Sequence, residues 1–311
     1  MLEVMVENLT KSYGRGLFER EKKIVLKDIS FVLKKEKITA LVGVNGAGKT
    51  TLIKLIMKII FSDEGKIFYN GLQEAAFKEM SFLPERPYLY MHLKGREFLE
   101  FMGKLSFLDD LTIKERSLEL AKKLHLEKAL ENLIKSYSKG MQQRLAIIST
   151  FLARPKMVIL DEPFSGLDPF GRKIVKDLLR EISEKERTTL FFTTHQLSDV
   201  EELAQEVLLL DGQKIKFHGG LQDLKKRNKK ESIFHVLLEE YEDIEILHHL
   251  FSVSSLFSAE GDFNYLFGPF TSLEKDFFLA FLYREKIKIR EVREEKKTLE
   301  DLLYPEGGER R

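Results

Sequence analysis

The feature that most constrains how this chain can fold is an eight-residue segment, Gly43–Thr50, with the pattern Gly-x-x-x-x-Gly-Lys-Thr. A continuous apolar run, Ile38–Val42, precedes it, and apolar residues at helical spacing, Leu52–Ile60, follow it. An unbroken apolar run of this length predicts a strand buried in a parallel sheet. Between such a strand and a helix, glycines let successive backbone N–H groups point at phosphate oxygens. The sequence therefore predicts a phosphate-binding loop at the start of a helix.

Two side chains of this loop have a direct chemical use. Lys49 can reach the β- and γ-phosphates of a nucleotide, and the Thr50 hydroxyl can bind Mg²⁺. The alternative is a glycine-rich turn that binds nothing, but a chance match is expected in only about one in a hundred chains of this length. We expect the following residues to contact the nucleotide: Gly43, Val44, Asn45, Gly46, Ala47, Gly48, Lys49, Thr50 and Thr51.

A second apolar strand, Met157–Leu160, ends in two carboxylates, Asp161 and Glu162. At the carboxyl end of a parallel strand, Asp161 would lie beside Thr50 and help to hold Mg²⁺. Glu162 would then orient or deprotonate a water molecule directed at the γ-phosphate. Two acids before a proline also fit an ordinary surface loop, and it is the upstream phosphate-binding loop that favours a catalytic pair.

His195 follows another apolar strand, Thr188–Thr194. A lone histidine is more often structural than catalytic. This one lies at the edge of the sheet where open α/β folds bind their ligands. We therefore expect it to donate a hydrogen bond to the γ-phosphate.

Strand and helix patterns alternate along residues 157–210, which indicates a parallel sheet covered by helices. Residues 92–136 are rich in Leu, Lys and Glu with helical periodicity, and they predict a helical insertion. Near the N-terminus, residues 2–9 alternate as a strand does, and we expect a turn at residues 11–14. Residues 64–71 predict a short hairpin.

Composition limits the possible classes of protein. A chain of 311 residues is long enough for two domains, since one domain usually takes about 100–200 residues. With 51 basic and 50 acidic residues, the chain has no excess of positive charge that would favour nucleic acid as a partner. It contains no cysteine, which excludes disulfides and thiolate sites. Neither a membrane-spanning segment nor a signal peptide is expected.

Beyond about residue 221 the pattern changes again. The basic segment Lys225–Lys230 is typical of a polar linker. The residues that follow predict, in order, a strand at 233–238, a helix at 243–251, strands at 253–258 and 262–267, a helix at 273–285 and a strand at 287–294. This βαββαβ order predicts a small α+β domain of ferredoxin-like type over residues 221–311.

Residues 1–220 resemble the nucleotide-binding domain of ABC transporters. Besides the loop and the two acids, Tyr137–Arg144 is similar to the family's Leu-Ser-Gly-Gly-Gln signature, and Ser165–Asp168 is similar to its D-loop. His195 matches the switch histidine, and Tyr13 matches the aromatic residue that stacks on adenine.

The resemblance implies an α/β fold of the P-loop NTPase type, with an antiparallel β subdomain and a helical subdomain at about residues 88–147. It further implies that nucleotide is contacted by Ser138, Gly140, Gln142 and Asp168.

Two places depart from the family pattern. Lys139 and Met141 replace the usual Gly and Gln of the signature, and Glu85 stands where the Q-loop usually has glutamine, although glutamate can still bind Mg²⁺. With the tail Thr298–Leu303, these departures resemble the branch that contains drug and antibiotic exporters, which favours export over import. Ser138 is equally compatible with a simple helix N-cap.

The resemblance also implies a mechanism and partners. Each ATP, with Mg²⁺, would be held between the phosphate-binding loop of one subunit and the signature of another, which predicts a homodimer of ATPase subunits. Hydrolysis would drive a separate transmembrane permease subunit, so that the chain would be cytoplasmic and peripheral on the cytoplasmic face of the cell membrane.

Two rival functions remain. A soluble ABC ATPase acting on nucleic acid or ribosomes is disfavoured by the balanced charge and by the lack of long coiled coils, zinc motifs or a second cassette. A module that binds nucleotide without turnover is disfavoured by Glu162 and His195.

Overall fold

The computed structural model describes residues 2–15, 21–73, 77–223, 232–238, 264–270, 279, 282 and 289–295. The chain divides into two compact units, Met1–Leu221 and Gln222–Arg311. No helix in the described ranges combines the length and the apolar composition that crossing a lipid bilayer requires.

A six-stranded sheet forms the centre of the first unit. In spatial order its strands are β5 (Met80–Leu83), β6 (Met157–Leu160), β7 (Thr189–Thr194), β3 (Ile38–Val42), β8 (Glu206–Asp211) and β9 (Lys214–Gly220). The first five are parallel, and β9 runs antiparallel to β8. Every residue of β3, β6 and β7 is buried, which explains why these strands are mostly apolar and carry no charged residue.

A three-stranded antiparallel sheet lies beside it in the same unit. In spatial order its strands are β2 (Glu21–Leu33), β1 (Val4–Arg15) and β4 (Glu64–Tyr69). The expected turn at residues 11–14 is wrong, because β1 continues to Arg15. Asp63 stabilises this extension: its carboxylate accepts hydrogen bonds from the backbone N–H and the hydroxyl of Ser12, both at 2.6 Å. Where a hairpin is expected at residues 64–71, the structure has the single strand β4, which pairs with β1. Only its last residue, Tyr69, turns back, in an isolated antiparallel bridge with Leu72.

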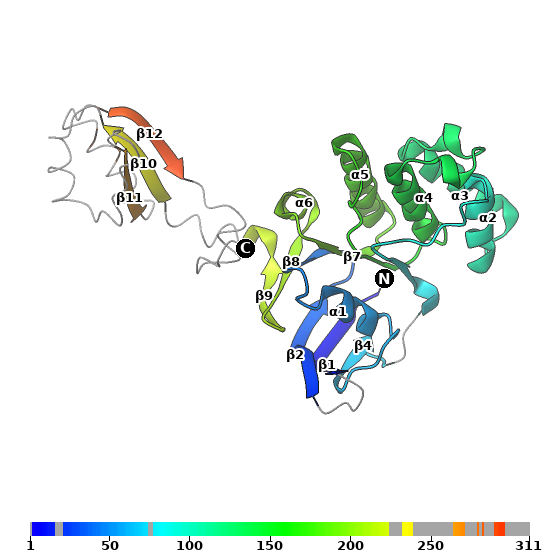
Figure 1. The fold of residues 1–311 in the computed structure, drawn as a ribbon, viewed down its shortest axis with the longest axis horizontal. Coiled ribbons are helices and arrows are strands. Elements are labelled where there is room, and N and C mark those ends of the chain that lie inside the picture. The colour runs from blue at the N-terminus through cyan, green and yellow to red at the C-terminus, as the bar shows by residue number, and fades with distance from the viewer. Residues whose placement is uncertain are drawn as a thin grey trace. The chain divides into compact units, whose positions relative to one another are not determined.

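Helices cover both faces of the six-stranded sheet (Figure 1). On one face, α1 (Lys49–Ile56) shares a core with the antiparallel sheet, and Leu52 and Ile53 are fully buried there. On the other face lie α5 (Pro169–Lys185) and α6 (Leu197–Leu203). The remaining helices of the unit are α2 (Gly95–Leu105), α3 (Asp110–Lys123), α4 (Lys139–Phe151) and the short 3₁₀ turns η1 (Phe77–Glu79), η2 (Glu127–Ala129) and η3 (Ile134–Ser136).

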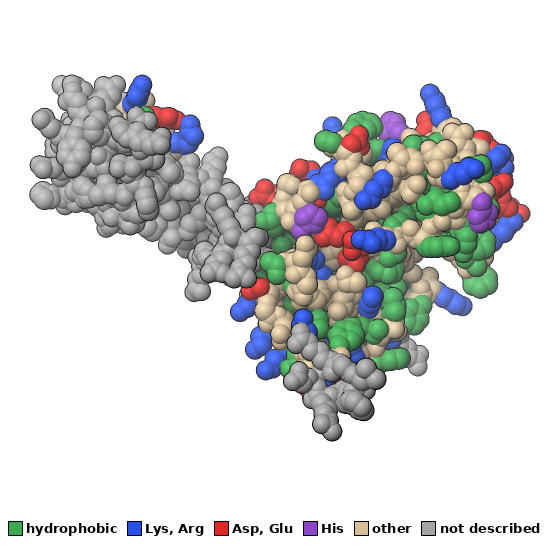
Figure 2. All heavy atoms as spheres, in the orientation of Figure 1, with side chains coloured by type: hydrophobic (Ala, Val, Ile, Leu, Met, Phe, Trp, Pro, Cys, Tyr) green, Lys and Arg blue, Asp and Glu red, His purple; other side chains and the backbone are tan. Residues whose placement is uncertain are grey.

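In the helical layer formed by α2, α3 and α4, the helices α2 and α3 fall within the insertion that the periodicity of residues 92–136 predicts, and α4 follows it. The layer is tied to the end of α5 by a cluster of charges. Arg116 of α3 is 3% exposed, and its guanidinium pairs with Glu119 at 2.9 Å and with Glu186 at 2.5 Å. Its Nε also lies 3.5 Å from the carbonyl oxygen of Phe151. On the face shown in Figure 2, acidic, basic and hydrophobic side chains are intermingled over this layer.

The second unit contains a three-stranded antiparallel sheet. In spatial order its strands are β11 (Asn264–Phe270), β10 (Ser232–Leu238) and β12 (Ile289–Glu295), each of which confirms a strand that the sequence predicts nearby. Of the helix predicted at 273–285, only Leu279 and Leu282 are described, and both are helical. Leu282 and Val236 are buried. The helix predicted at 243–251, the strand predicted at 253–258, the basic segment 225–230 and the tail 298–303 lie outside the described residues.

Candidate functional site

The loop between β3 and α1 follows a path that favours glycine at two places. The φ angle is +81° at Gly46 and +107° at Gly48, in the region that side chains disfavour. A Cβ on Gly48 would also lie 2.9 Å from the Leu26 side chain. No side chain caps the N-terminus of α1, which begins at Lys49. The N–H groups of its first turn are therefore left for an external acceptor, and an anion is the acceptor that the helix dipole favours.

Lys49 projects from the start of α1 toward this loop. Its ammonium group donates to the carbonyl oxygens of Gly43 at 2.7 Å and Val44 at 3.3 Å, and the residue is 8% exposed. Burial lowers the pKa of Lys49, while the nearby carboxylates of Glu162, Asp161 and Glu85 oppose that shift. The loop carbonyls therefore hold the lysine in place while acids surround it.

Asp161 lies at the carboxyl end of β6 and is 3% exposed. One carboxylate oxygen accepts a hydrogen bond from the Thr50 hydroxyl at 3.1 Å, and the other accepts one from the Thr193 hydroxyl at 2.6 Å. Since β7 lies between β6 and β3, Thr193 of β7 is the residue that fixes this carboxylate from the intervening strand. The predicted proximity of Asp161 and Thr50 is confirmed.

Glu162 and His195 face each other across the same strand ends. The His195 Nδ1 lies 3.0 Å from the Glu162 Oε2. Glu162 has φ of +49°, an unusual value for a non-glycine residue, and its N–H donates to the Thr193 hydroxyl at 2.8 Å. The side chain of His195 is 57% exposed, whereas that of Glu162 is 17% exposed. The pair therefore combines a shielded carboxylate with an imidazole that is open to a ligand.

The segment that carries His195 is anchored by a fully buried carboxylate, Asp199, which is 0% exposed. Asp199 accepts a hydrogen bond from the Thr194 hydroxyl at 3.2 Å. It also forms ion pairs with Lys176 at 2.8 Å and with Arg172 at 3.4 Å, both from α5. Because Thr194 adjoins His195, this cluster fixes the backbone from which the imidazole projects.

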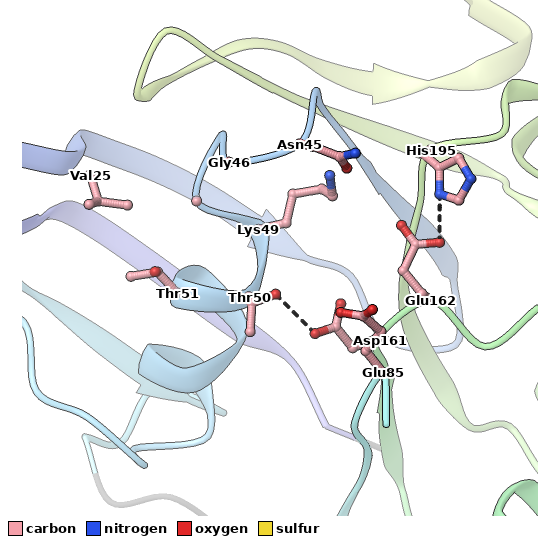
Figure 3. A pocket seen from close by; sticks show the side chains of 11 residues that line it. Val25, Asn45, Gly46, Lys49, Thr50, Thr51, Glu85, Asp161, Glu162 and His195 are labelled. Atoms are coloured by element: carbon pink, nitrogen blue, oxygen red, sulfur yellow. Dashed lines mark hydrogen bonds and ion pairs between the residues drawn. The ribbon is translucent and has the colours of Figure 1, made fainter. Parts of the chain in front are cut away.

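Eleven residues line one cavity of about 420 Å³ (Figure 3). Ten of its lining residues were predicted from the sequence: Asn45, Gly46, Gly48, Lys49, Thr50, Thr51, Glu85, Asp161, Glu162 and His195. The eleventh, Val25 of β2, was missed, because nothing in the sequence places that strand beside the loop. Thr193 and Asp199 were missed too. The two polar residues at 193–194, at the end of a strand whose centre is apolar, could have indicated a role for Thr193.

The other predicted residues do not line the cavity, and they are Tyr13, Gly43, Val44, Ala47, Ser138, Gly140, Gln142 and Asp168. Ser138 caps α4 by accepting from the Met141 N–H at 3.2 Å, and Asp168 caps α5 by accepting from the Gly171 N–H at 2.9 Å. The Gln142 side chain donates to the Tyr137 carbonyl oxygen at 3.1 Å. Tyr13 is 42% exposed. Within one copy of the chain, the signature segment therefore does not contribute to the site.

The oxygen atoms that line the cavity are of the kind that Mg²⁺ prefers as ligands. Thr50 and Asp161 offer hydroxyl and carboxylate oxygens that are already 3.1 Å apart, and Glu85 lines the same cavity. Mg²⁺ prefers oxygen ligands and usually takes only one or two carboxylates, with phosphates and water completing its shell. In the described part of the chain, no group of three or more His, Asp or Glu side chains is arranged to hold a metal by itself. The site therefore suits a metal that arrives with phosphate.

Comparison with known proteins gives consistent matches. The family described as ABC transporter matches residues 26–165. An uncharacterised ABC transporter ATP-binding protein of Bacillus subtilis, YxlF, is 34% identical over 224 residues, which are 72% of this chain and 73% of the relative. A solved ATP-binding subunit of an ABC transporter is 30% identical, with a TM-score of 0.63 over 72% of this chain and 92% of its own. A dimeric ATP-binding cassette bound to ADP and Pi has a TM-score of 0.64 over 70% of this chain and 98% of its own; at 22% identity, it supports the fold alone.

Proposed function

Since this chain belongs to the ABC transporter family of ATP-binding subunits, we propose that it binds and hydrolyses ATP to power transport through a separate membrane subunit. One observation carries the proposal: a single cavity is lined by a loop of the phosphate-binding type and by two pairs of side chains. Thr50 is hydrogen-bonded to Asp161, and His195 is hydrogen-bonded to Glu162. This is the set of groups that phosphoryl transfer to water requires, namely phosphate binding, metal ligands and a base.

The roles follow from the positions. The N–H groups of the loop and the Lys49 ammonium bind the β- and γ-phosphates, and this requires Lys49 to exchange its carbonyl partners for phosphate oxygens. Thr50 and Asp161, with Glu85 as a further ligand, would hold Mg²⁺, which would supply positive charge beside the phosphates. Glu162 accepts a proton from the attacking water. His195 orients that carboxylate and donates to the γ-phosphate from its exposed face.

The complete site is formed by two copies of the chain. Ser138 and Gly140 lie outside the cavity of their own chain, so the signature of a second copy would cover the nucleotide. Each signature would then place the N-terminus of α4, which begins at Lys139, against a γ-phosphate. A solved cassette with the same fold is itself described as dimeric.

The test of the proposal is ATP-dependent assembly. Glu162→Gln with ATP and Mg²⁺ should form a dimer in size-exclusion chromatography with light scattering, because unhydrolysed nucleotide remains between the two half-sites. Ser138→Arg in the same background should stay monomeric, since it places a bulky side chain at the γ-phosphate. A Glu162→Gln protein that remains monomeric at saturating ATP would contradict the shared site.

The direction of transport is proposed as export. It is supported by Lys139 and Met141 in the signature and by Glu85 at the Q-loop position, which depart from the usual family residues. The partner is a transmembrane permease, and the working location is the cytoplasmic face of the membrane. Transport of a radiolabelled substrate into inverted vesicles that contain the permease would establish export, and uptake into right-side-out vesicles would contradict it.

For residues 221–311 we propose a βαββαβ domain that modulates dimer contact or permease docking and does not take part in ATP chemistry. In a ferredoxin-like domain the first strand pairs with the third and fourth strands, and the antiparallel order β11–β10–β12 supports that arrangement. A chain ending at about residue 220 should fold and bind ATP with little change in affinity while its dimerisation or coupling weakens. Loss of ATP binding in a folded truncated protein would assign the tail to the active site.

A further inference from the structure

The two residues that flank His195 in the chain are both hydrogen-bonded to charged groups that lie away from the nucleotide cavity. On one side, the Thr194 hydroxyl donates to the Asp199 carboxylate at 3.2 Å. On the other side, the side-chain oxygen of Gln196 accepts a hydrogen bond from the guanidinium of Arg172. The Gln196 N–H also donates to the Thr194 hydroxyl at 3.0 Å. The imidazole therefore projects from a backbone that is held immediately before and immediately after it.

Arg172, near the start of α5, contacts both parts of this arrangement. The Nη1 atom that donates to Gln196 also lies 3.4 Å from the Asp199 carboxylate. A guanidinium presents its N–H groups in a rigid plane, so it can hold two acceptors in a fixed relation to each other. The backbone N–H of Arg172 donates to the carbonyl oxygen of the cap residue Asp168 at 2.9 Å. Arg172 thus connects the first turns of α5 to the segment of His195.

Lys176 extends the same cluster to the loop that carries Glu162. Its ammonium group lies 2.8 Å from the Asp199 carboxylate. It also lies over the ring of Phe164, two residues after Glu162, at 5.6 Å from the ring centroid. Because Lys176 is only 7% exposed and already pairs with Asp199, that buried carboxylate keeps a cation when Arg172 is replaced. Replacing Arg172 should therefore free the segment of His195 without leaving a buried charge alone.

We propose that Arg172 is a positioning residue for ATP hydrolysis: it holds the segment of His195 so that the imidazole stays 3.0 Å from the Glu162 carboxylate (Figure 3). Arg172 does not line the nucleotide cavity, so it acts through His195. The inference rests on the function proposed above, in which Glu162 and His195 act at the γ-phosphate. A displacement of about 1 Å in a reacting group can lower a rate about 100-fold, whereas nucleotide affinity depends mainly on the loop and Lys49.

The test compares Arg172→Met with Arg180→Met in the full-length chain. Arg180 also joins α5 to α6, because its guanidinium donates to the Glu202 carbonyl oxygen at 3.0 Å, but Glu202 lies at the end of α6 that is far from His195 in the chain. Arg172→Met should lower kcat for phosphate release about 10- to 100-fold and leave the Kd for ATP unchanged. Arg180→Met should keep the parent kcat. Equal losses of kcat would overturn the proposal, because they would assign the effect to the packing of α6 on α5.

Gln196→Ala tests the same hydrogen bond from its other end. It removes the acceptor of Arg172 without burying an unpaired charge, so it should lower kcat in the same direction even if Arg172→Met does not fold. A parent rate in Gln196→Ala would contradict the proposal.

A spectroscopic measurement follows His195 without reference to turnover. With ¹³C-labelled histidine, the ring signal of His195 is the one that disappears in His195→Ala. That signal should shift in Arg172→Met and Gln196→Ala and should stay in place in Arg180→Met. A parent protein that releases no phosphate would contradict the proposed function, whereas an active parent whose kcat and His195 signal are unchanged by Arg172→Met would overturn only the role of Arg172.

Discussion

The strand ends of the central sheet and the helical layer beside it use the same charged residue types in different ways. At the strand ends, Lys49 and Asp161 are buried, and each is held by at least two hydrogen bonds. In the helical layer, pairs such as Arg96 with Glu131 have side chains more than half exposed. Water screens exposed pairs, so they contribute little to stability. Charges at the strand ends are therefore arranged for chemistry, whereas most charges of the helical layer keep its surface hydrated.

Arg116 is the exception within the helical layer. It belongs to α3 but is as buried as Asp161, and it joins that helix to Glu186 at the end of α5. The contrast thus depends on burial rather than on which layer a residue belongs to. Substitutions at the strand ends, at Arg116 and at an exposed neighbour should show whether burial or the layer decides what a charged residue contributes.

The largest effect is expected from Glu162→Gln. Loss of the base should lower kcat for ATP hydrolysis by a factor on the order of 10²–10⁴, with ATP affinity retained. Phosphate release and nucleotide binding would be measured side by side. Glu184→Gln, which changes an exposed acid of α5, should hydrolyse ATP at the parent rate. Hydrolysis by Glu162→Gln near that rate would remove Glu162 from the mechanism.

The next effect is expected from Lys49→Ala. Without the ammonium group, ATP affinity should fall about 10- to 100-fold, the range expected for losing a hydrogen bond between charged groups. Fluorescence titration with a labelled ATP analogue measures it. Lys54→Ala is the matched control, since Lys54 lies on the same helix, α1, and is exposed. Equal losses in the two variants would mean that general positive charge, and not the position of Lys49, attracts the nucleotide.

A smaller effect, on stability rather than on chemistry, is expected from Arg116→Met. Removing one partner from a buried ion cluster should lower the free energy of unfolding by about 2–3 kcal/mol. This is less than the about 3–5 kcal/mol expected for a fully buried pair, because Glu119 and Glu186 are partly exposed to water. Arg154 approaches the same two acids at 3.8 Å but is 62% exposed, so Arg154→Met should change little. Urea unfolding compares the two. Similar losses would show that burial does not decide the contribution.

The smallest effect concerns pH. Burial raises the pKa of Glu119, but hydrogen bonds from Lys123 and Arg116 outweigh it and hold that pKa at about 2, below the ordinary value of 4.5. A carboxylate with a lowered pKa stabilises the fold above its unfolded pKa, and that stability is lost as the pH falls from about 4.5 toward 2. Glu119→Gln should reduce the pH dependence of the thermal midpoint in this window. An unchanged slope would show that Glu119 is not a source of the acid sensitivity.

The sequence predicts the phosphate-binding loop well because every element of that prediction is local. The glycines, Lys49 and Thr50 fall within eight residues, and a buried strand and a helix flank them. It predicts β1 and β4 poorly, because their ends depend on Asp63, whose carboxylate binds Ser12 from 51 positions away. It misses β9 for a related reason: Lys214–Gly220 has weak alternation and two glycines, and it forms a strand by pairing with β8.

The sequence by itself therefore determined which chemical groups this protein has: a loop for phosphate, the acids Asp161 and Glu162, and His195 after a buried strand. The tertiary structure decided how they meet. The strand order β6–β7–β3 places Thr193 between the acids and the loop, and the buried Asp199 of α6 ties the segment of His195 to α5 through its ion pair with Lys176. It also placed Ser138 and Gly140 outside the cavity. Local propensity acts over a few residues, whereas these distances are set by sheet pairing and by burial of charge, which join residues far apart in the chain.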